Sequence, residues 1–376
     1  MSLVITIIVL ALLIFNEKIL MPAYTQKTDQ IVSEQISAEP GEADLQEEEA
    51  KQNSIVNKND NQPAGKTTTI IFAGDVLIKA AMEQRYDEEG ISGLVSEELL
   101  AEMQNADICM VNNEFQFSNR GTPMEDKQFT FRTDPKYVQV MLDMGVDIVS
   151  LANNHSLDYG IEALEDTFHT LENAGILYVG AGATKERAKA LQVVEVNGLK
   201  IGFLAATRVI PVSQWNVEYR EPGLFTTYDD TGLMASIEEA REACDFLTVY
   251  VHWGEEKEEY YQQYQTTIAR HCFEAGADLV IGAHPHVLQG IEFMDGNPVF
   301  YSLGNYIFAH SIEQTAMVKV GIRTDGEAVY SLIPAYARGL KTQMLTGSKA
   351  ENLYDYMNEL SPNAFLDEKG NIYEIE

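Results

Sequence analysis

Residues 278–286 read Asp-Leu-Val-Ile-Gly-Ala-His-Pro-His, so a short apolar run of the kind that forms a buried strand leads directly into two histidines. Four other strand-like runs, at residues 69–74, 106–113, 147–153 and 246–251, end in the same way. They lead into Asp75, into Glu114, into Asn154 and His155, and into His252. In open α/β sheets, ligands bind beyond the carboxyl ends of the strands. The five runs therefore predict one site with mixed nitrogen and oxygen ligands, which suits a divalent cation.

From residue 67 onward, these runs alternate with amphipathic stretches that predict helices at 161–174 and 261–275. Gly175 and Gly276 follow the two stretches, where a left-handed helix cap is expected. Asn197-Gly198 separates two further apolar runs and predicts a β-hairpin. Together these patterns predict an α/β layered fold in which the sheets are mixed.

The composition narrows the class of protein. The chain has 376 residues, 45% of them hydrophobic, and a formal net charge of −32. A field of this sign repels nucleic acid, and it disfavours anionic substrates unless a bound metal reverses the local potential. Three widely spaced cysteines, Cys109, Cys244 and Cys272, lie in apolar surroundings and predict buried thiols, with no disulfide framework.

The N-terminal region predicts export. Residues 3–15 are an almost unbroken apolar run, short for a membrane span and of the right length for a signal-peptide core. We interpret residues 1–24 as a signal peptide or membrane anchor and 25–66 as a disordered acidic linker. The protein is then extracytoplasmic, either membrane-anchored or secreted. Residues 67–345 are predicted to form the globular domain, and 346–376 a C-terminal extension that begins with a helix.

The candidate metal ligands are Asp75, Glu114, Asn154, His252, His284 and His286. In an extended segment, His284 and His286 would project the same way and offer two imidazoles, and His252 adds a third. Asp75 could be a terminal carboxylate ligand, Glu114 a carboxylate that bridges two cations, and Asn154 a ligand through its carbonyl. Each has a structural alternative: a glycine–aspartate turn, an exposed acid at a strand end, and an asparagine that supplies turn geometry.

The same region offers a proton donor. His155 is a candidate general acid, and Asp158 is close enough in sequence to orient its ring. One or two divalent ions, with Mn, Zn or Fe as candidates, would generate hydroxide near neutral pH and polarise an ester oxygen. This combination suits hydrolysis of a phosphate ester, with His155 protonating the leaving group.

Six motifs resemble those of the CapA family, the bacterial capsule synthesis and poly-γ-glutamate biosynthesis proteins. They occur in the family's order at residues 72–75, 113–115, 152–160, 252–256, 281–290 and 301–306. The resemblance implies a relation to calcineurin-like metallophosphoesterases, and with it a four-layer α/β sandwich of two mixed sheets flanked by helices. It also implies a membrane-anchored extracytoplasmic protein, with poly-γ-glutamate synthase components or the polymer itself as partners.

One departure from the phosphoesterase pattern concerns the first metal. Those enzymes begin with an Asp-x-His ligand pair, whereas this chain has Asp75-Val76-Leu77 and so lacks the first imidazole. Three functions remain open from the sequence. The first is an accessory protein of capsule polymer production with a metal site, the second a secreted metal-dependent phosphoesterase, and the third a non-enzymatic module that binds polymer or a partner.

Overall fold

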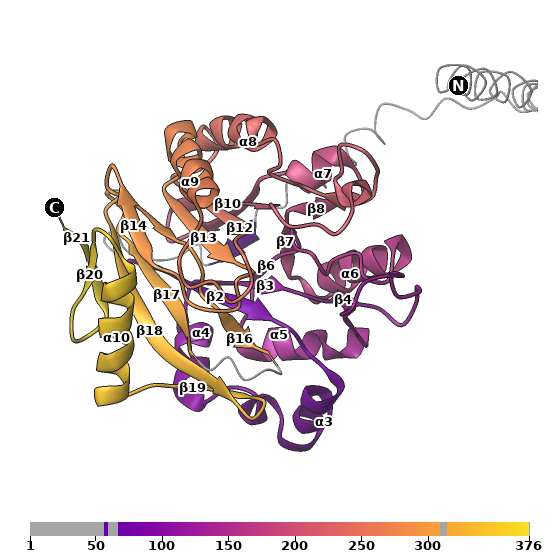
Figure 1. Ribbon diagram of the computed structural model, residues 1–376, viewed down its shortest axis with the longest axis horizontal. Helices are drawn as coiled ribbons and strands as arrows, with labels where there is room; N and C mark the ends of the chain where they lie inside the picture. Colours follow the sequence, from indigo (N-terminus) through magenta and orange to yellow (C-terminus); the bar gives the residue numbers. More distant parts are fainter. Residues whose placement is uncertain (1–55, 59–66, 309–313, 376) are drawn as a thin grey trace, which may run out of the picture. The chain divides into compact units, whose positions relative to one another are not determined.

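The computed structural model describes residues 56–58, 67–308 and 314–375, which form a mixed α/β fold (Figure 1). The segment predicted as signal peptide or anchor, residues 1–24, lies outside the described residues. So does the predicted linker, except for Val56–Lys58, which forms strand β1. Within the described ranges, no helix is both long and apolar enough to cross a membrane.

The first large sheet has seven strands in the order β1-β9-β10-β12-β13-β15-β14. The central strands β10, β12, β13 and β15 are parallel, whereas the β9–β10 and β14–β15 pairs are antiparallel. Their bounds are β9 Gln192–Val196, β10 Leu199–Thr207, β12 Phe246–His252, β13 Leu279–Ala283, β14 Ile291–Met294 and β15 Asn297–Phe300.

The second large sheet has ten strands, in the order β20-β21-β18-β17-β2-β3-β6-β7, with β16 beside β2 and β19 beside β18. Strands β2, β3, β6 and β7 are parallel, and β17 is antiparallel to β2. Their bounds are β2 Thr68–Val76, β3 Ile108–Asn113, β6 Ile148–Ser150, β7 Leu177–Val179, β16 Asn305–Ile307, β17 Gln314–Ile322, β18 Ala328–Arg338, β19 Lys341–Met344, β20 Ala364–Leu366 and β21 Asn371–Glu374.

The described residues also form two short two-stranded sheets and eight α-helices. The short sheets pair β4 Gln116–Phe117 with β5 Arg132–Thr133, and β8 Ala181–Gly182 with β11 Gly223–Leu224. The helices are α3 Ala80–Glu89, α4 Glu97–Asn105, α5 Val138–Met144, α6 Ile161–Ala174, α7 Lys185–Lys189, α8 Thr231–Arg241, α9 Gln263–Ala275 and α10 Ser348–Leu360.

The two large sheets face each other across one apolar cluster. Side chains alternate along β2: Ile70 and Phe72 join residues of the seven-stranded sheet, whereas Ile71 and Ala73 pack under helices α3 to α6. A third cluster lies between the seven-stranded sheet and helices α8 and α9. The layers are therefore helices, sheet, sheet and helices. Because both faces of the central strands are buried, their sequences are mostly apolar, as in Leu279–Ala283.

The main sequence predictions for this part are confirmed. Helix α6 spans residues 161–174 as predicted, and α9 begins two residues later than predicted, at Gln263. Gly175 and Gly276 adopt the left-handed conformation at the helix ends. The β9–β10 hairpin turns at Asn197-Gly198, and the three cysteines are buried as predicted.

For the C-terminal residues, the sequence predicts the helix but not the two strands that follow it. The expected helix is α10, and its residues Leu353 and Met357 pack in the cluster between the sheets. The short strands β20 and β21, which extend the ten-stranded sheet, were not predicted. The boundary at residue 345 stays a prediction.

Candidate metal centre

The five strand ends come from the two facing sheets: β2, β3 and β6 are consecutive strands of the ten-stranded sheet, and β12 and β13 are neighbours in the seven-stranded sheet (Figure 1). In the ten-stranded sheet, Asp75 on β2 is in register with Asn112 on β3. In the seven-stranded sheet, His252 on β12 is in register with Ala283, the residue before His284. The convergence predicted from the sequence is therefore present in the fold.

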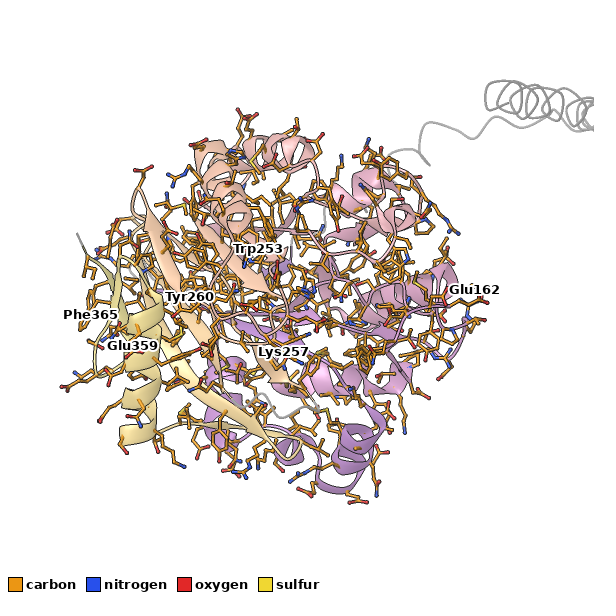
Figure 2. The ribbon with its side chains drawn as sticks, in the orientation of Figure 1. Glu162, Trp253, Lys257, Tyr260, Glu359 and Phe365 are labelled. Carbon is orange, nitrogen blue, oxygen red and sulfur yellow. The ribbon has the colours of Figure 1, made fainter. Side chains whose placement is uncertain are left out.

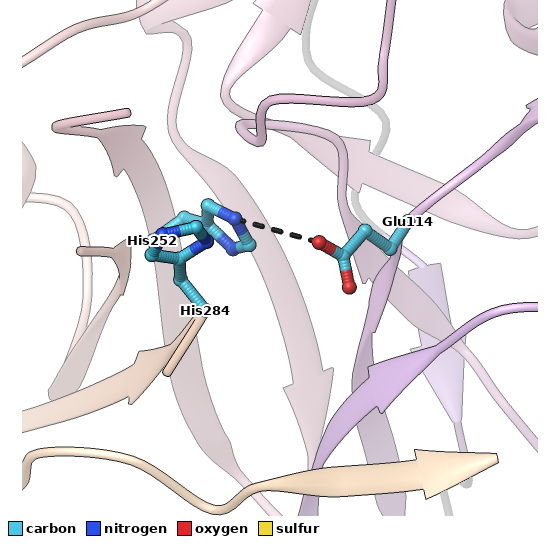
Figure 3. Close-up of side chains that lie close together, drawn as sticks. All are labelled: Glu114, His252 and His284. Carbon is cyan, nitrogen blue, oxygen red and sulfur yellow. Dashed lines mark ion pairs between the residues drawn. The ribbon is translucent and has the colours of Figure 1, made fainter. Parts of the chain in front are cut away.

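Glu114 lies at the middle of this cluster, directly after β3. Its side chain is fully buried, and neither carboxylate oxygen has a hydrogen-bond partner within the described residues. Nε2 of His252 lies 3.7 Å from Oε1 of Glu114 (Figure 3). Burial and the neighbouring Asp75 carboxylate raise the pKa of Glu114 well above its usual range. An unpaired buried carboxylate costs several kcal/mol, so this residue fits a site that holds a cation.

Glu114, His252 and His284 form one potential ligand set, which we name the imidazole group. Their ligand atoms lie within 4.8 Å of one another, and the two imidazole centroids are 4.7 Å apart (Figure 3). His284 Nδ1 is buried without a partner among the described residues. Burial and the neighbouring His284 lower the pKa of His252 well below its usual range, and burial and His286 lower that of His284 to about 3. Both rings are thus neutral at pH 7, the form that binds metals.

Asp75, Glu114 and His286 form a second potential set, the carboxylate group, which shares Glu114 with the first. Asp75 Oδ2 lies 3.3 Å from Nδ1 of His286 and accepts a hydrogen bond from the backbone N–H of His284. Burial acts against a charged His286, but the Glu114 and Asp75 carboxylates outweigh it and raise its pKa to about 9. Without a cation, this group therefore holds a proton.

The His-Pro-His segment differs from the prediction in one respect. His284 and His286 have φ values of 102° and 62°, so the segment is not extended and the two rings do not project as neighbours on one strand face. Their centroids are 5.8 Å apart, and each imidazole belongs to a different group. Positive φ at a residue with a Cβ costs of order 1–3 kcal/mol, and such strain is common at functional sites.

Asn154 lies beside the imidazole group, with its Oδ1 2.9 Å from Nε2 of His252. The preceding residue, Asn153, supplies turn geometry, because its Oδ1 accepts a hydrogen bond from the backbone N–H of His155. Asn112, which the sequence did not single out, donates from Nδ2 to Asp75 at 2.8 Å and lies 3.4 Å from Nδ1 of His252. It links the two groups and fixes the orientation of the Asp75 carboxylate.

The predicted pairing of His155 with Asp158 is present, since His155 Nδ1 lies 2.7 Å from Oδ2 of the fully buried Asp158. The backbone N–H of Phe131 also donates to this oxygen, at 2.7 Å. Burial lowers the pKa of His155 although Asp158 acts in the opposite direction. The pair is held in place and belongs to the same buried cluster as the ligand groups.

Lys127 is another residue at this site that the sequence did not single out. Its ammonium group donates to Asp158 and to the backbone carbonyl of Asn154, and Nζ lies 3.1 Å from His155 Nδ1. It also lies over the ring of Trp215, 5.2 Å from the centroid. Lys127 comes from the loop between β4 and β5 and follows none of the five strand ends.

The end of β12 is anchored by Trp253, which follows His252 in the chain and is labelled in the interior of the fold in Figure 2. Its side chain is fully buried, and its Nε1 donates to the Tyr301 carbonyl at 2.9 Å. The backbone N–H of Trp253 donates to the carbonyl of Ala283 at 3.0 Å. These contacts fix the ends of β12 and β13 relative to each other, and with them the two rings of the imidazole group.

Residues 69–310 match a protein family described as Bacterial capsule synthesis protein PGA_cap. The chain is 29% identical over 272 residues to the PGA biosynthesis protein CapA of Bacillus subtilis (strain 168), a match that covers 70% of each chain. It is 28% identical over 276 residues to the Capsule biosynthesis protein CapA of Bacillus anthracis, covering 71% of this chain and 66% of that protein.

Among solved structures, the sulfate thiohydrolase SoxB of Thermus thermophilus is 12% identical, with a TM-score of 0.43. The match covers 73% of this chain and 58% of that one. This likeness is too slight to say anything about the chemistry of the present chain.

Proposed function

The chain belongs to the bacterial capsule synthesis protein family PGA_cap, and from this premise we propose that it is an extracytoplasmic accessory protein of poly-γ-glutamate synthesis or export with a divalent-metal centre. The observation that carries the metal part of the proposal is the fully buried Glu114 carboxylate, which has no hydrogen-bond partner in the described chain and is shared by two ligand groups. The role in poly-γ-glutamate production is supported by the names of the two CapA relatives.

The imidazole group together with Asn154 would hold one ion, and the carboxylate group would hold another. Mixed nitrogen and oxygen donors suit Mn, Zn or Fe. When bound, such ions polarise a substrate oxygen and lower the pKa of bound water to about 7. We also propose that the four-layer fold is of the metallophosphoesterase-like type.

The chain's own residues would control proton movement. Asp158 holds the His155 ring through Nδ1 at 2.7 Å, which leaves Nε2 as the atom that can give a proton to a leaving group. The Phe131 ring lies 4.4 Å from the His155 ring, and the Phe308 ring lies 4.8 Å from the His286 ring. These phenyl groups are placed to restrict water beside both histidines.

The proposed location rests on the sequence. Residues 3–15 would act as a signal or membrane anchor, and residues 25–66 would tether the folded part. Synthase components or the polymer are the proposed partners. A net charge of −32 opposes contact with a polyanion, and bound divalent ions would offset this charge locally.

The test is complementation of a poly-γ-glutamate-producing strain that lacks its own CapA protein. We expect the full chain to restore capsule and Glu114→Ala to fail at equal protein level. Lack of restoration by the full, exported chain would contradict the proposed role in the capsule pathway.

A second candidate function, phosphoester hydrolysis, is favoured by the oriented His155–Asp158 pair beside the centre. It would be tested with a generic phosphate ester and purified full chain, with and without Mn²⁺. Metal-dependent turnover that His155→Ala reduces by about 10²–10⁴-fold is the expected result if the pair is catalytic. If His155→Ala also restores capsule fully, the centre acts in binding and not in catalysis.

A further inference from the structure

The carboxylate group is short of one donor relative to the phosphoesterase pattern. The missing imidazole would follow Asp75 by two positions, where this chain has Leu77. Leu77 is fully buried and packs in the apolar cluster under helices α3 to α6. Its side chain therefore belongs to the hydrophobic layer and supplies nothing to the centre.

A different segment occupies the place beside Asp75. Strand β16 runs parallel to β2, with Asn305 in register with Asp75. The backbone N–H of Asp75 donates to the Gly304 carbonyl at 3.0 Å. A Cβ on Gly74 would lie only 1.9 Å from that carbonyl oxygen, so glycine at this position permits the close approach of β16. Gly304 and Asn305 both belong to the sequence motif at residues 301–306.

The Asn305 side chain points at the carboxylate group. It is 1% exposed, and its Oδ1 lies 2.8 Å from Nδ1 of His286, the same nitrogen that lies 3.3 Å from Asp75 Oδ2. Atoms that bind one ion at right angles through bonds of about 2.1 Å are about 3.0 Å apart. Both distances are compatible with three donors that surround a single cation. Asn305 Nδ2 is buried with no partner in the described residues, so no other contact explains this amide.

We propose that Asn305 is a further protein ligand of the ion held by the carboxylate group, through its amide oxygen. This inference rests on the proposed metal centre. Asn305 takes the place of the imidazole that the phosphoesterase pattern puts at position 77. It replaces a nitrogen donor by an oxygen donor, and this shifts the preference of the site toward Mn²⁺ or Mg²⁺ and away from Zn²⁺.

The competing role is orientation, in which Asn305 only accepts a hydrogen bond from His286. Loss of an orienting contact typically weakens metal binding 10–100-fold and leaves the number of bound ions unchanged. Loss of a ligand weakens binding further and changes the coordination of the ion. Stoichiometry at saturation and the absorption spectrum of bound Co²⁺ therefore separate the two roles.

The experiment compares the full chain with Asn305→Ala, Asn305→Asp and the control Asn363→Ala. Asn363 is a hydrogen-bonded asparagine outside the centre, paired with the backbone of Phe293. Mn²⁺ binding is measured by titration calorimetry, Co²⁺ coordination by absorption, and folding by thermal unfolding. We expect two Mn²⁺ ions in the wild type, in Asn305→Asp and in the control, and one in Asn305→Ala. The absorption spectrum of Co²⁺-loaded Asn305→Ala should lack the bands of the missing ion.

Several results would overturn the inference. Two ions in Asn305→Ala with an unchanged Co²⁺ spectrum would show orientation only. Loss of the ion in a folded Asn305→Asp would exclude an oxygen ligand at this position. If the wild type binds only one ion and His284→Ala loses it, this inference is wrong but the proposed metal centre stands. A wild type that binds none would remove both.

Discussion

The imidazole group and the carboxylate group share Glu114 but differ in every other donor. The first combines that carboxylate with two imidazoles that are neutral at pH 7, whereas the second combines two carboxylates with an imidazole that holds a proton. The residues of the first come mainly from the seven-stranded sheet, and Asp75 of the second comes from the ten-stranded sheet. The two sites differ in charge and in the proportion of nitrogen to oxygen donors, so they should prefer different metals. Loss of the shared Glu114 should weaken metal binding at both sites.

Glu114→Gln should have the largest effect. The amide keeps the shape but removes the shared charge, so we expect both ions to be lost from the full chain in elemental analysis. The metal-free variant should unfold at the same temperature as the metal-free wild type or higher, because it no longer buries an unpaired carboxylate. Retention of two ions would mean that the groups do not share this ligand.

Each single histidine variant should lose the ion of one ligand group and keep the ion of the other. His284→Ala is expected to lose the ion of the imidazole group and keep the other, and His286→Ala is expected to do the reverse. His271→Ala is the matched control, since His271 pairs with Asp230 on the surface side of α9. Calorimetric titration with Mn²⁺ would count the ions. Loss of both ions in either single variant would show that the two groups bind cooperatively as one site.

The pH dependence should differ between the groups. His286 has a pKa of about 9 in the metal-free protein, so below pH 9 its proton must leave before the carboxylate group binds an ion. Apparent affinity should therefore rise by about tenfold per pH unit from pH 6 to 9 in His284→Ala, which keeps that group. The slope should be smaller in His286→Ala, because His252 and His284 are already neutral. A slope of zero in His284→Ala would exclude His286 as a ligand.

Lys127→Gln should have the smallest effect on metal content. Lys127 contacts Asp158 and the Asn154 backbone but belongs to neither ligand group. We expect two ions to remain, a lower midpoint of thermal unfolding, and reduced hydrolysis if His155 is catalytic. Loss of an ion in this variant would show that the loop between β4 and β5 holds Asn154 in place for binding.

The five strands that lead to the centre could be predicted because their sequences are apolar on both faces and end abruptly in polar residues. The divergence of His284 and His286 could not, since positive φ at non-glycine residues has no signal in the sequence. Lys127 and Asn305 reach the centre from a loop and from a three-residue strand, and only tertiary contacts bring them there. Strands β20 and β21 were missed because short alternating segments resemble a polar extension.

The most direct test of the shared centre is the Mn²⁺ content of the full chain compared with a His284→Ala/His286→Ala double variant. Both proteins would be folded, loaded with Mn²⁺ under the same conditions and desalted before elemental analysis. We predict two ions per wild-type chain and none in the double variant. Equal Mn²⁺ content in the two proteins would contradict a centre built on these strand ends.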